Sequence, residues 1–489
     1  MCARMCAKLF KFAAVLTALL LIPALTARAA EKPAKKKTLM AGAATSNITP
    51  PIGLPTIGGW KPVTSTHIHD ELHVRCLVLD NGQTRLAIAI CDNIGIPRDV
   101  LDEAKRQLNE KAGLPVDHVM TTGTHTHSAP SAYSGNSLKS IEKFTDYQKL
   151  IICRIVDGVR TAIYNLEPAK VGWGAAAEPT QVFNRRWLMK PGEHLRNPFG
   201  GMDKARMNPP RRSPDLIEPA GPTDPQISFV TVRAVDDRPI ALLANYSLHY
   251  VGGVERGAVS ADYFAMFADR IQQLIEADRV DPPFVGIMTN GTSGDINNID
   301  FQGTPKRFDR YGKMRQVANL VAEAVFKAQA GVKFHDWVPL GAAQRELTLK
   351  VRKPTAAQMA WAAELTARTG EAKGHLEHRQ RVYARRFKQL SEAPEKIEIV
   401  MQAMRIGDVG IVGIPFEAFC EIGLEIKAKS PLPRTFVVSF GNGSYGYLPT
   451  PRHFELGGYE TRLGTNKVEP QAAPKIVKTL LELLSELSK

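Results

Sequence analysis

Residues 84–123, "TRLAIAICDNIGIPRDVLDEAKRQLNEKAGLPVDHVMTTG", contain the segments that decide the fold class. Two strand-like runs, "TRLAIAIC" at 84–91 and "DHVMTTG" at 117–123, flank the helix-like segment "VLDEAKRQLNEKAG" at 100–113. The first run is apolar at every position from Leu86 to Cys91, which is typical of a strand that is buried on both faces. We therefore expect a sheet that is covered on both sides.

Strand-like and helix-like segments continue to alternate along the chain, and no break in composition separates one part from another. The 489 residues are therefore expected to form an α/β protein with mixed β-sheets layered between helices, in a single large catalytic domain over residues 40–489. Further strand candidates are "HVRCLVL" at 73–79, "QISFVTVRA" at 226–234, "PIALLANYSL" at 239–248, "PFVGIMT" at 283–289 and "VGIVGI" at 409–414. The segment 186–225 is rich in Pro, Gly and charge and is expected to be a long loop.

The first 29 residues resemble a secretory signal peptide. Basic residues precede an apolar run from Phe12 to Leu25, and Ala27-Arg28-Ala29 is a small-x-small cleavage pattern. The run is shorter than the roughly 20 residues that a membrane-spanning helix needs. We expect a signal peptide at 1–29, a basic linker at 30–39, and an exported protein that is periplasmic or secreted.

The formal net charge of +14 is spread along the chain. The densest basic run, "EHRQRVYARRFK" at 377–388, looks like one solvated face of a helix. An alternative is peripheral contact with an anionic membrane or envelope polymer. No nucleic-acid partner is expected, because no recognised binding motif and no aromatic residues interleaved with the basic run are present.

The cysteines outside the predicted signal do not suggest a disulfide framework or a zinc knuckle. They are widely spaced and contain no C-x-x-C pair; they are Cys76, Cys91, Cys153 and Cys420. Cys76 and Cys91 lie in apolar strand-like runs, where a buried thiol is the common outcome. A disulfide remains an alternative in an oxidising compartment.

Two histidines follow the strand candidate at 117–123, in "GTHTHSAP" at 123–130. Residues i and i+2 of a strand point to the same side, so His125 and His127 would share a face if this stretch stayed extended. Such a pair by itself is weak support for a metal site. A second run, "HIHDELH" at 67–73, precedes a strand, and because no other segment pairs with it we do not expect it to bind metal.

Three other strand candidates also end at polar residues. "PIALLANYSLHYVGG" ends at His249, "PFVGIMTNGTSGDINNID" leads to Asp295 and Asn297, and "VGIVGIPFEAFCEIG" leads to Glu417 on the expected first turn of a helix. A hydrolytic zinc site needs three His or carboxylate ligands and an open position, which His125, His249 and Glu417 would supply. The alternatives are a carboxylate that faces a helix dipole for Glu417 and a buried, hydrogen-bonded imidazole for His249.

The sequence resembles the neutral/alkaline, non-lysosomal ceramidase family, whose members are zinc amidases that hydrolyse the N-acyl bond of ceramide. The resemblance covers residues 40 to about 465. It rests on "AGAATSNITPPIGLPTIGG" (41–59), "IHDELHVRCLVLD" (68–80), "GTHTHSAP" (123–130), "VFNRR" (182–186), "NYSLHYVGG" (245–253), "SADYF" (260–264), "NGTSGDINN" (290–298), "GIPFEAFCEIG" (413–423) and "NGSYGYLPTPRHFELGGYE" (442–460).

The resemblance implies a Zn²⁺ cofactor and a set of site residues. The implied zinc ligands are His125, His249, Glu417 and Tyr447. The implied catalytic residues are His127, which moves protons, and Tyr459 and Arg185, one or the other of which stabilises the oxyanion. The expected reaction is hydrolysis of an N-acyl amide by zinc-activated water.

Three differences from the family pattern concern the nucleophile and the substrate. Asn297 occupies the place of a family serine that has been considered a nucleophile, which disfavours a serine-acyl route. "PRHF" at 451–454 replaces an acidic pair. A C-terminal immunoglobulin-like domain that ceramide-hydrolysing members usually carry is not in this sequence. Alternatives to a ceramidase are therefore a zinc esterase or amidase for a non-ceramide substrate and a catalytically degenerate lipid- or envelope-binding protein.

Overall fold

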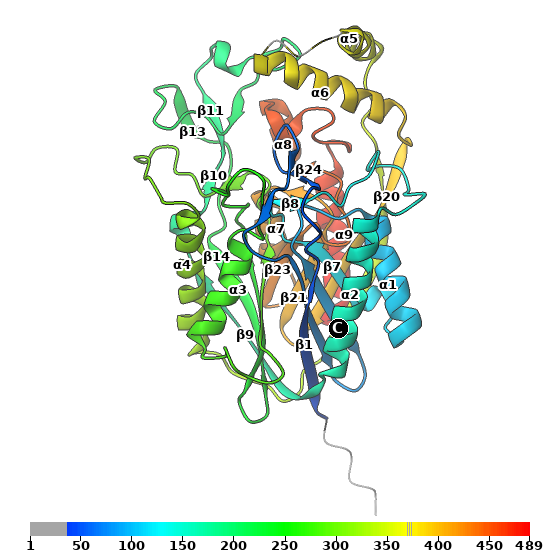
Figure 1. Ribbon diagram of the computed structural model, residues 1–489, viewed down its shortest axis with the longest axis vertical. Coiled ribbons are helices and arrows are strands. Elements are labelled where there is room, and N and C mark those ends of the chain that lie inside the picture. Colours follow the sequence, from blue (N-terminus) through cyan, green and yellow to red (C-terminus); the bar gives the residue numbers. More distant parts are fainter. Residues whose placement is uncertain (1–36, 369, 371, 373) are drawn as a thin grey trace, which may run out of the picture. The chain divides into compact units, whose positions relative to one another are not determined.

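Two β-sheets pack face to face between layers of helices (Figure 1). The computed structural model describes residues 37–368, 370, 372 and 374–489. The architecture confirms the predicted α/β class with mixed sheets in one large domain. The predicted signal peptide at 1–29 and the linker residues before Lys37 lie outside the described residues.

The larger sheet has eight strands in the order β17-β15-β14-β9-β1-β5-β6-β7. The pairs β6–β7 and β15–β17 are parallel, and the other neighbours are antiparallel. The strands are β1 (Leu39–Asn47), β5 (His73–Asp80), β6 (Arg85–Cys91), β7 (Val119–Gly123), β9 (Glu167–Ala177), β14 (Gln226–Ala234), β15 (Pro239–Tyr246) and β17 (Val285–Asn290).

Alternate residues of this sheet are buried on opposite faces, as the apolar runs predict. In β5, Cys76 and Val78 face the layer of α1 (Arg98–Ala112) and α2 (Asp146–Tyr164), whereas Leu77 and Leu79 face the second sheet. Full burial of a side chain such as Leu contributes about 1.5–3 kcal/mol, so both faces add to the stability of the sheet. α2 begins at a capping box, in which the Thr145 hydroxyl accepts a hydrogen bond from the Gln148 amide at 3.2 Å.

The second sheet has four strands in the order β19-β20-β21-β23. β21 and β23 are parallel, and the other pairs are antiparallel. One face packs against the larger sheet, and the other packs against α6, α7 and α9. The strands are β19 (Leu340–Lys350), β20 (Lys396–Ile406), β21 (Val409–Ile414) and β23 (Arg434–Ser439).

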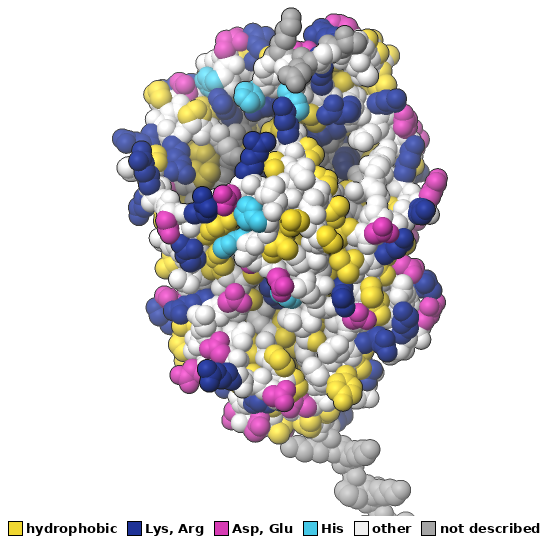
Figure 2. All heavy atoms as spheres, in the orientation of Figure 1, with side chains coloured by type: hydrophobic (Ala, Val, Ile, Leu, Met, Phe, Trp, Pro, Cys, Tyr) yellow, Lys and Arg dark blue, Asp and Glu magenta, His cyan; other side chains and the backbone are white. Residues whose placement is uncertain are grey.

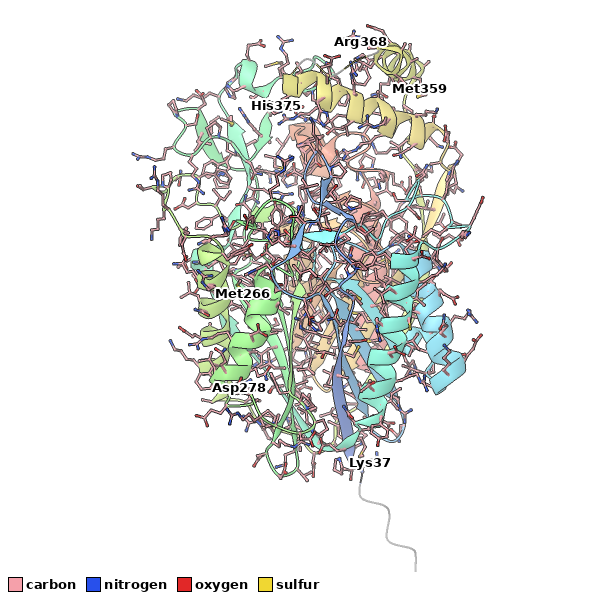
Figure 3. The ribbon with its side chains drawn as sticks, in the orientation of Figure 1. Lys37, Met266, Asp278, Met359, Arg368 and His375 are labelled. Carbon is pink, nitrogen blue, oxygen red and sulfur yellow. The ribbon has the colours of Figure 1, made fainter. Side chains whose placement is uncertain are left out.

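The remaining helices cover the outer faces and one end of the sheets. α3 and α4 lie beside α1 and α2 on the larger sheet, and α5 and α6 lie at the top of Figures 1 and 3, where His375 marks the beginning of α6. They are α3 (Tyr263–Leu274), α4 (Gly312–Gln329), α5 (Ala356–Ala367), α6 (Gly374–Ser391), α7 (Cys420–Lys429), α8 (Pro451–Leu456) and α9 (Ala472–Ser488), with single 3₁₀ turns η1 (Val116–His118), η2 (Pro179–Gln181), η3 (Glu193–Leu195) and η4 (Tyr459–Thr461). Within the described part of the chain, no helix is long and apolar enough to span a bilayer.

Several short strands connect these layers. The segment 186–225, expected to be a loop, contains a three-stranded sheet of β12 (Ala205–Met207), β11 (Arg186–Met189) and β13 (Leu216–Pro219). That expectation was wrong because Trp187, Met189 and Leu195 form a small apolar core with Phe301. The other short strands are β2 (Pro55–Ile57), β3 (Val63–Thr64), β4 (His67–Ile68), β8 (Ala129–Pro130), β10 (Phe183–Asn184), β16 (Ala258–Val259), β18 (Ile296–Asn297), β22 (Glu417–Ala418) and β24 (Tyr447–Leu448).

The four cysteines of the described residues are free thiols. Cys76, Cys91 and Cys420 are buried, and Cys153 is exposed. Burial raises the pKa of the Cys76 thiol well above its ordinary value, so this thiol is protonated and unreactive at neutral pH.

Candidate metal and catalytic site

The side chains predicted as ligands come together where strands of both sheets end. His125 follows β7, His249 follows β15 and Glu417 follows β21. The Nε2 atoms of His125 and His249 are 3.1 Å apart, and Glu417 Oε2 lies 3.4 Å from His125 Nε2 and 3.9 Å from His249 Nε2. Residues nearly 300 positions apart in the sequence thus form one buried cluster.

The path of the chain at His125 differs from the sequence expectation. β7 ends at Gly123, and His125 has a φ of 75°, so the stretch containing His125 and His127 does not continue as a strand. The amide of His125 donates to Asn93 O at 2.8 Å, which holds this turn. The two imidazoles still converge, with 3.1 Å between their Nε2 atoms, because the turn and not strand alternation directs them.

Glu417 also lies in a different element from the one predicted. It belongs to the two-residue strand β22, and α7 begins only at Cys420. β22 pairs in parallel with β24, and in this register Glu417 is directly opposite Tyr447. The pairing places a carboxylate and a phenol side by side at the cluster. The prediction of a helix N-terminal position was wrong because Pro415 and Phe416 precede a strand pairing that local sequence does not show.

Each of the three histidines has one ring nitrogen beside a backbone carbonyl. The Nδ1 atoms of His125, His127 and His249 lie 2.6, 2.9 and 3.1 Å from the carbonyl oxygens of Ile94, Gly58 and Ser293, respectively. Because a carbonyl only accepts hydrogen bonds, the proton of each neutral ring is on Nδ1. The three Nε2 lone pairs therefore point toward one another, and metal-binding histidines are oriented in the same way.

The electrostatics of the cluster keep the rings of His127 and His249 neutral. Burial, together with the neighbouring His125 and Arg185, holds the pKa values of His127 and His249 well below their ordinary value. Burial opposes ionisation of Glu417, but His125, Tyr447 and Arg185 hold the pKa of its carboxyl below the ordinary value. The site therefore combines neutral imidazoles with an ionised carboxylate, which is the donor set that zinc prefers.

The donor set has room for a cation among its atoms. Glu417 Oε2 is buried and has no hydrogen-bond donor among the described residues, which costs free energy unless a cation or water satisfies it. Within the described residues, one group of three or more His, Cys, Asp or Glu has all its ligand atoms within 4.8 Å of one another: His125, His127 and His249. The geometry thus fits a divalent metal, and the donor atom of His127 belongs to the same group as those of His125 and His249.

Arg185 and the two tyrosines surround the open side of this cluster. Arg185 is buried and donates to the Tyr447 hydroxyl at 2.9 Å and to Gly294 O at 2.7 Å. The Tyr459 ring packs edge-on against Tyr447, with 5.7 Å between centroids. The structure therefore brings together all seven residues that the resemblance implies, and their individual roles stay predictions.

Two supporting residues were not predicted from the sequence. Gly58 supplies the carbonyl that orients His127, and a Cβ atom at Gly58 would lie 2.5 Å from His127 Cβ, so only glycine fits there. Glu460 is buried beside Arg185 and Arg186. Its position directly after Tyr459, inside a motif that the resemblance includes, is a signal that could have identified it.

The remaining polar segments lie outside the cluster. The side-chain amide of Asn297 donates to Asn208 Oδ1 at 2.8 Å. His67 lies beside Glu255, and Asp70 accepts from the Ser260 hydroxyl at 2.6 Å. The "HIHDELH" run thus connects β4 and β5 to the β16 region.

The fold and site are those of a layered α/β protein with a His-rich centre, and solved structures of ceramidases share this fold. A neutral ceramidase from Pseudomonas aeruginosa matches with a TM-score of 0.68 and 16% identity, over 92% of this chain and 75% of that one. A ceramidase complexed with C2 matches with a TM-score of 0.67, the same identity and the same coverage. No protein-family model matches the sequence, and neither does any curated protein. The likeness of fold predicted from the sequence motifs is confirmed.

Proposed function

We propose that the protein is an exported zinc-dependent hydrolase that cleaves the amide of an N-acyl compound, ceramide or another. The observation that carries this proposal is the convergence of three imidazole lone pairs and the buried Glu417 carboxylate oxygen on a fold shared with ceramidases. The signal-like residues 1–29 support export, to the periplasm or beyond.

The proposed metal is held by His125, His249, Glu417 and Tyr447. A bound zinc ion supplies Lewis acidity toward the substrate carbonyl and activates water at neutral pH. His127 is placed to move the proton, because its neutral Nε2 faces the cluster while Nδ1 is held by Gly58 O. The ring of His127 stacks on Tyr250 with 3.7 Å between centroids, which fixes its orientation.

Asn297 supports direct attack by water over a serine-acyl route. A side-chain amide is not a nucleophile, and that of Asn297 is engaged with Asn208 and with the amide of Ile299. Ser293 donates to Asn290 Oδ1 at 2.7 Å and lies beside Nδ1 of His249, the ring nitrogen that carries the proton. Ser293 therefore lacks a base to activate it.

Tyr459 is proposed to donate a hydrogen bond to the carbonyl oxygen as negative charge develops there. We expect Tyr459→Phe to lower kcat roughly 100- to 1,000-fold while zinc content stays unchanged, because removal of one oxyanion donor has an effect of this size. Steady-state kinetics and elemental analysis measure the two quantities. Tyr164→Phe is the matched control, because Tyr164 is 89% exposed. A Tyr459→Phe enzyme with wild-type kcat would remove Tyr459 from the reaction.

Turnover of three matched substrates tests the proposed reaction. We expect the zinc-loaded protein to hydrolyse a long-chain N-acyl sphingosine or a short N-acyl amine and to release the free amine. The rate enhancement over the uncatalysed reaction should be larger for these amides than for the corresponding acyl ester. A tenfold difference in kcat/KM, about 1.4 kcal/mol, separates the candidates. A preference for the short N-acyl amine rejects ceramide as the substrate but retains the proposed amidase activity. Turnover of the ester alone rejects the amidase activity.

A further inference from the structure

A cavity of about 370 Å³ lies directly beside Tyr459. This volume is within the range of roughly 300–1,000 Å³ that is usual for small-molecule sites. Its walls come from the η3 region, β12, α6 and the α8–η4 connection. Trp60 and Tyr459 line it together, with 5.5 Å between their ring centroids.

The cavity is strongly cationic. Four arginines line it, and Asp203 is the one acidic side chain among its described lining residues; the arginines are Arg196, Arg206, Arg379 and Arg462. Asp203 forms an ion pair with Arg462, with 2.7 Å between Asp203 Oδ2 and Arg462 Nη2. Figure 2 shows Lys, Arg and His side chains gathered on the upper part of the molecule, at the level of α6.

Two of these arginines have no acidic partner among the described residues. Arg206 donates to a backbone carbonyl, His194 O, at 3.3 Å, and forms no ion pair within the described chain. Arg379 lies over the Trp60 ring, 5.3 Å from its centroid, and likewise has no carboxylate partner there. Unpaired guanidinium groups at the wall of a cavity are donors available to an anion.

The cationic cavity adjoins the proposed site of chemistry at one residue, Tyr459. Tyr459 lines the cavity, and its ring contacts Tyr447, which is opposite Glu417 in the β22–β24 pair. Arg386 lies 5.9 Å from the Trp60 centroid. Burial raises the pKa of Tyr459, and the nearby Arg386 offsets only part of this rise. A ligand in the cavity is therefore next to the phenol that faces the reacting carbonyl.

We propose that this cavity binds the anionic group of the substrate, so that the protein acts on N-acyl compounds whose amine part carries a carboxylate or sulfonate. The inference rests on the proposed amide hydrolysis and names its substrate class. An arginine fork matches a carboxylate or sulfonate with paired N–H···O bonds. A neutral sphingoid base would leave Arg206 and Arg379 without a counter-charge, and its apolar chain would face guanidinium groups.

The position of the cavity favours a small anionic substrate over an anionic membrane. Arg206 is half-buried, and the cavity is bounded by Gly458 and Tyr459 on the inner side. A flat bilayer surface does not reach the inner end of such a cavity, whereas the acid group of a small molecule does. Binding to a membrane is therefore the competing outcome of the test.

The test compares two ligands that the enzyme cannot hydrolyse. N-octylsulfonylglycine carries a carboxylate, and N-octylsulfonylethanolamine carries a hydroxyl in the same place. We expect calorimetry to give a Kd for the carboxylate at least tenfold lower than for the alcohol with the zinc-loaded wild type. Arg379→Gln and the double variant Arg206→Gln/Arg379→Gln should reduce this preference to less than threefold. Arg160→Gln, on the exposed side of α2, is the matched control and should retain it.

Three outcomes overturn the inference: equal affinities in the wild type, a preference that survives in the double variant, or arginine-dependent binding to phosphatidylglycerol vesicles with unchanged binding of N-octylsulfonylglycine. Thermal unfolding of each variant excludes a folding defect. Hydrolysis of N-octanoylglycine, N-octanoyltaurine and N-octanoylethanolamine is measured separately. If none of these amides or the N-acyl sphingosine is hydrolysed, the proposed function fails, whereas the binding comparison still decides the role of the cavity.

Discussion

His249→Ala and Glu417→Ala are each expected to lose the bound zinc and to lower kcat/KM by a factor of roughly 1,000 or more. His249 is buried and the Glu417 side chain is only 14% exposed, and each supplies a donor atom within 4 Å of the His125 Nε2 atom. Removing either one leaves an incomplete ligand set for the metal. Elemental analysis of the purified protein, beside kinetics, measures both effects, and about one zinc per chain is expected in the wild type.

The His127→Ala variant tests whether His127 is a metal ligand or a proton carrier. If His127 acts in proton transfer, as the sequence resemblance implies, the variant retains zinc and loses turnover. Loss of zinc would instead place His127 among the ligands, which the 3.1 Å between its Nε2 and that of His125 also permits. His69→Ala is the matched control, because His69 is exposed and stacks on Tyr311 away from the cluster.

A wild-type protein that contains no zinc would favour the alternative hypothesis of a non-catalytic lipid- or envelope-binding protein.

Glu460→Gln is expected to lower the free energy of unfolding by about 3–5 kcal/mol, since it removes the partner of buried charges. Glu460 Oε2 lies 2.5 Å from Arg186 Nη1, and its Oε1 lies 3.4 Å from Arg185 Nε. Arg186 and Glu460 are both fully buried. The substitution removes the direct ion-pair partner of the Arg186 guanidinium in a region of low dielectric constant, although Gly457 O still accepts from it at 2.6 Å.

Urea denaturation of the zinc-free protein isolates this effect from metal binding. Glu455→Gln, an exposed residue of α8, is the matched control and should change the free energy of unfolding by less than about 0.5 kcal/mol. Arg185 also holds the Tyr447 hydroxyl, so a displaced Arg185 would lower zinc affinity in the Glu460→Gln variant as well. A variant as stable as the wild type would show that Arg185 and Arg186 do not need the Glu460 carboxylate as a counter-charge.

The burial of the larger sheet on both faces was predictable, because it follows from a local pattern of apolar residues. The run from Leu86 to Cys91 is apolar at odd and even positions, and the structure packs the two sets against the second sheet and against the α1–α2 layer. The likeness to ceramidases was predictable from short motifs, most of which lie at strand ends. In contrast, the three-stranded sheet within 186–225 was not, since its short strands are stabilised by contact with Phe301 and not by their own pattern.

The sequence also indicated which residues belong to the candidate site but not how they converge. His125 and His127 were expected to share a face through strand alternation, and the turn at His125, with its φ of 75°, achieves the contact differently. Glu417 was expected on a helix and lies on β22. In each case the deciding interactions are pairings between distant segments, such as β22 with β24, that no local pattern contains.

The sequence by itself determined that the strands are buried on both faces and that His125, His249 and Glu417 follow separate strands, because the apolar runs and the polar residues after them are visible position by position. Only the tertiary structure decided that the Nε2 lone pairs face one another, that Glu460 lies between two arginines, and that a cationic cavity opens beside Tyr459. These properties depend on distances of a few ångströms between segments that are far apart in the chain. Such distances exist only after the sheets, loops and helices have packed together.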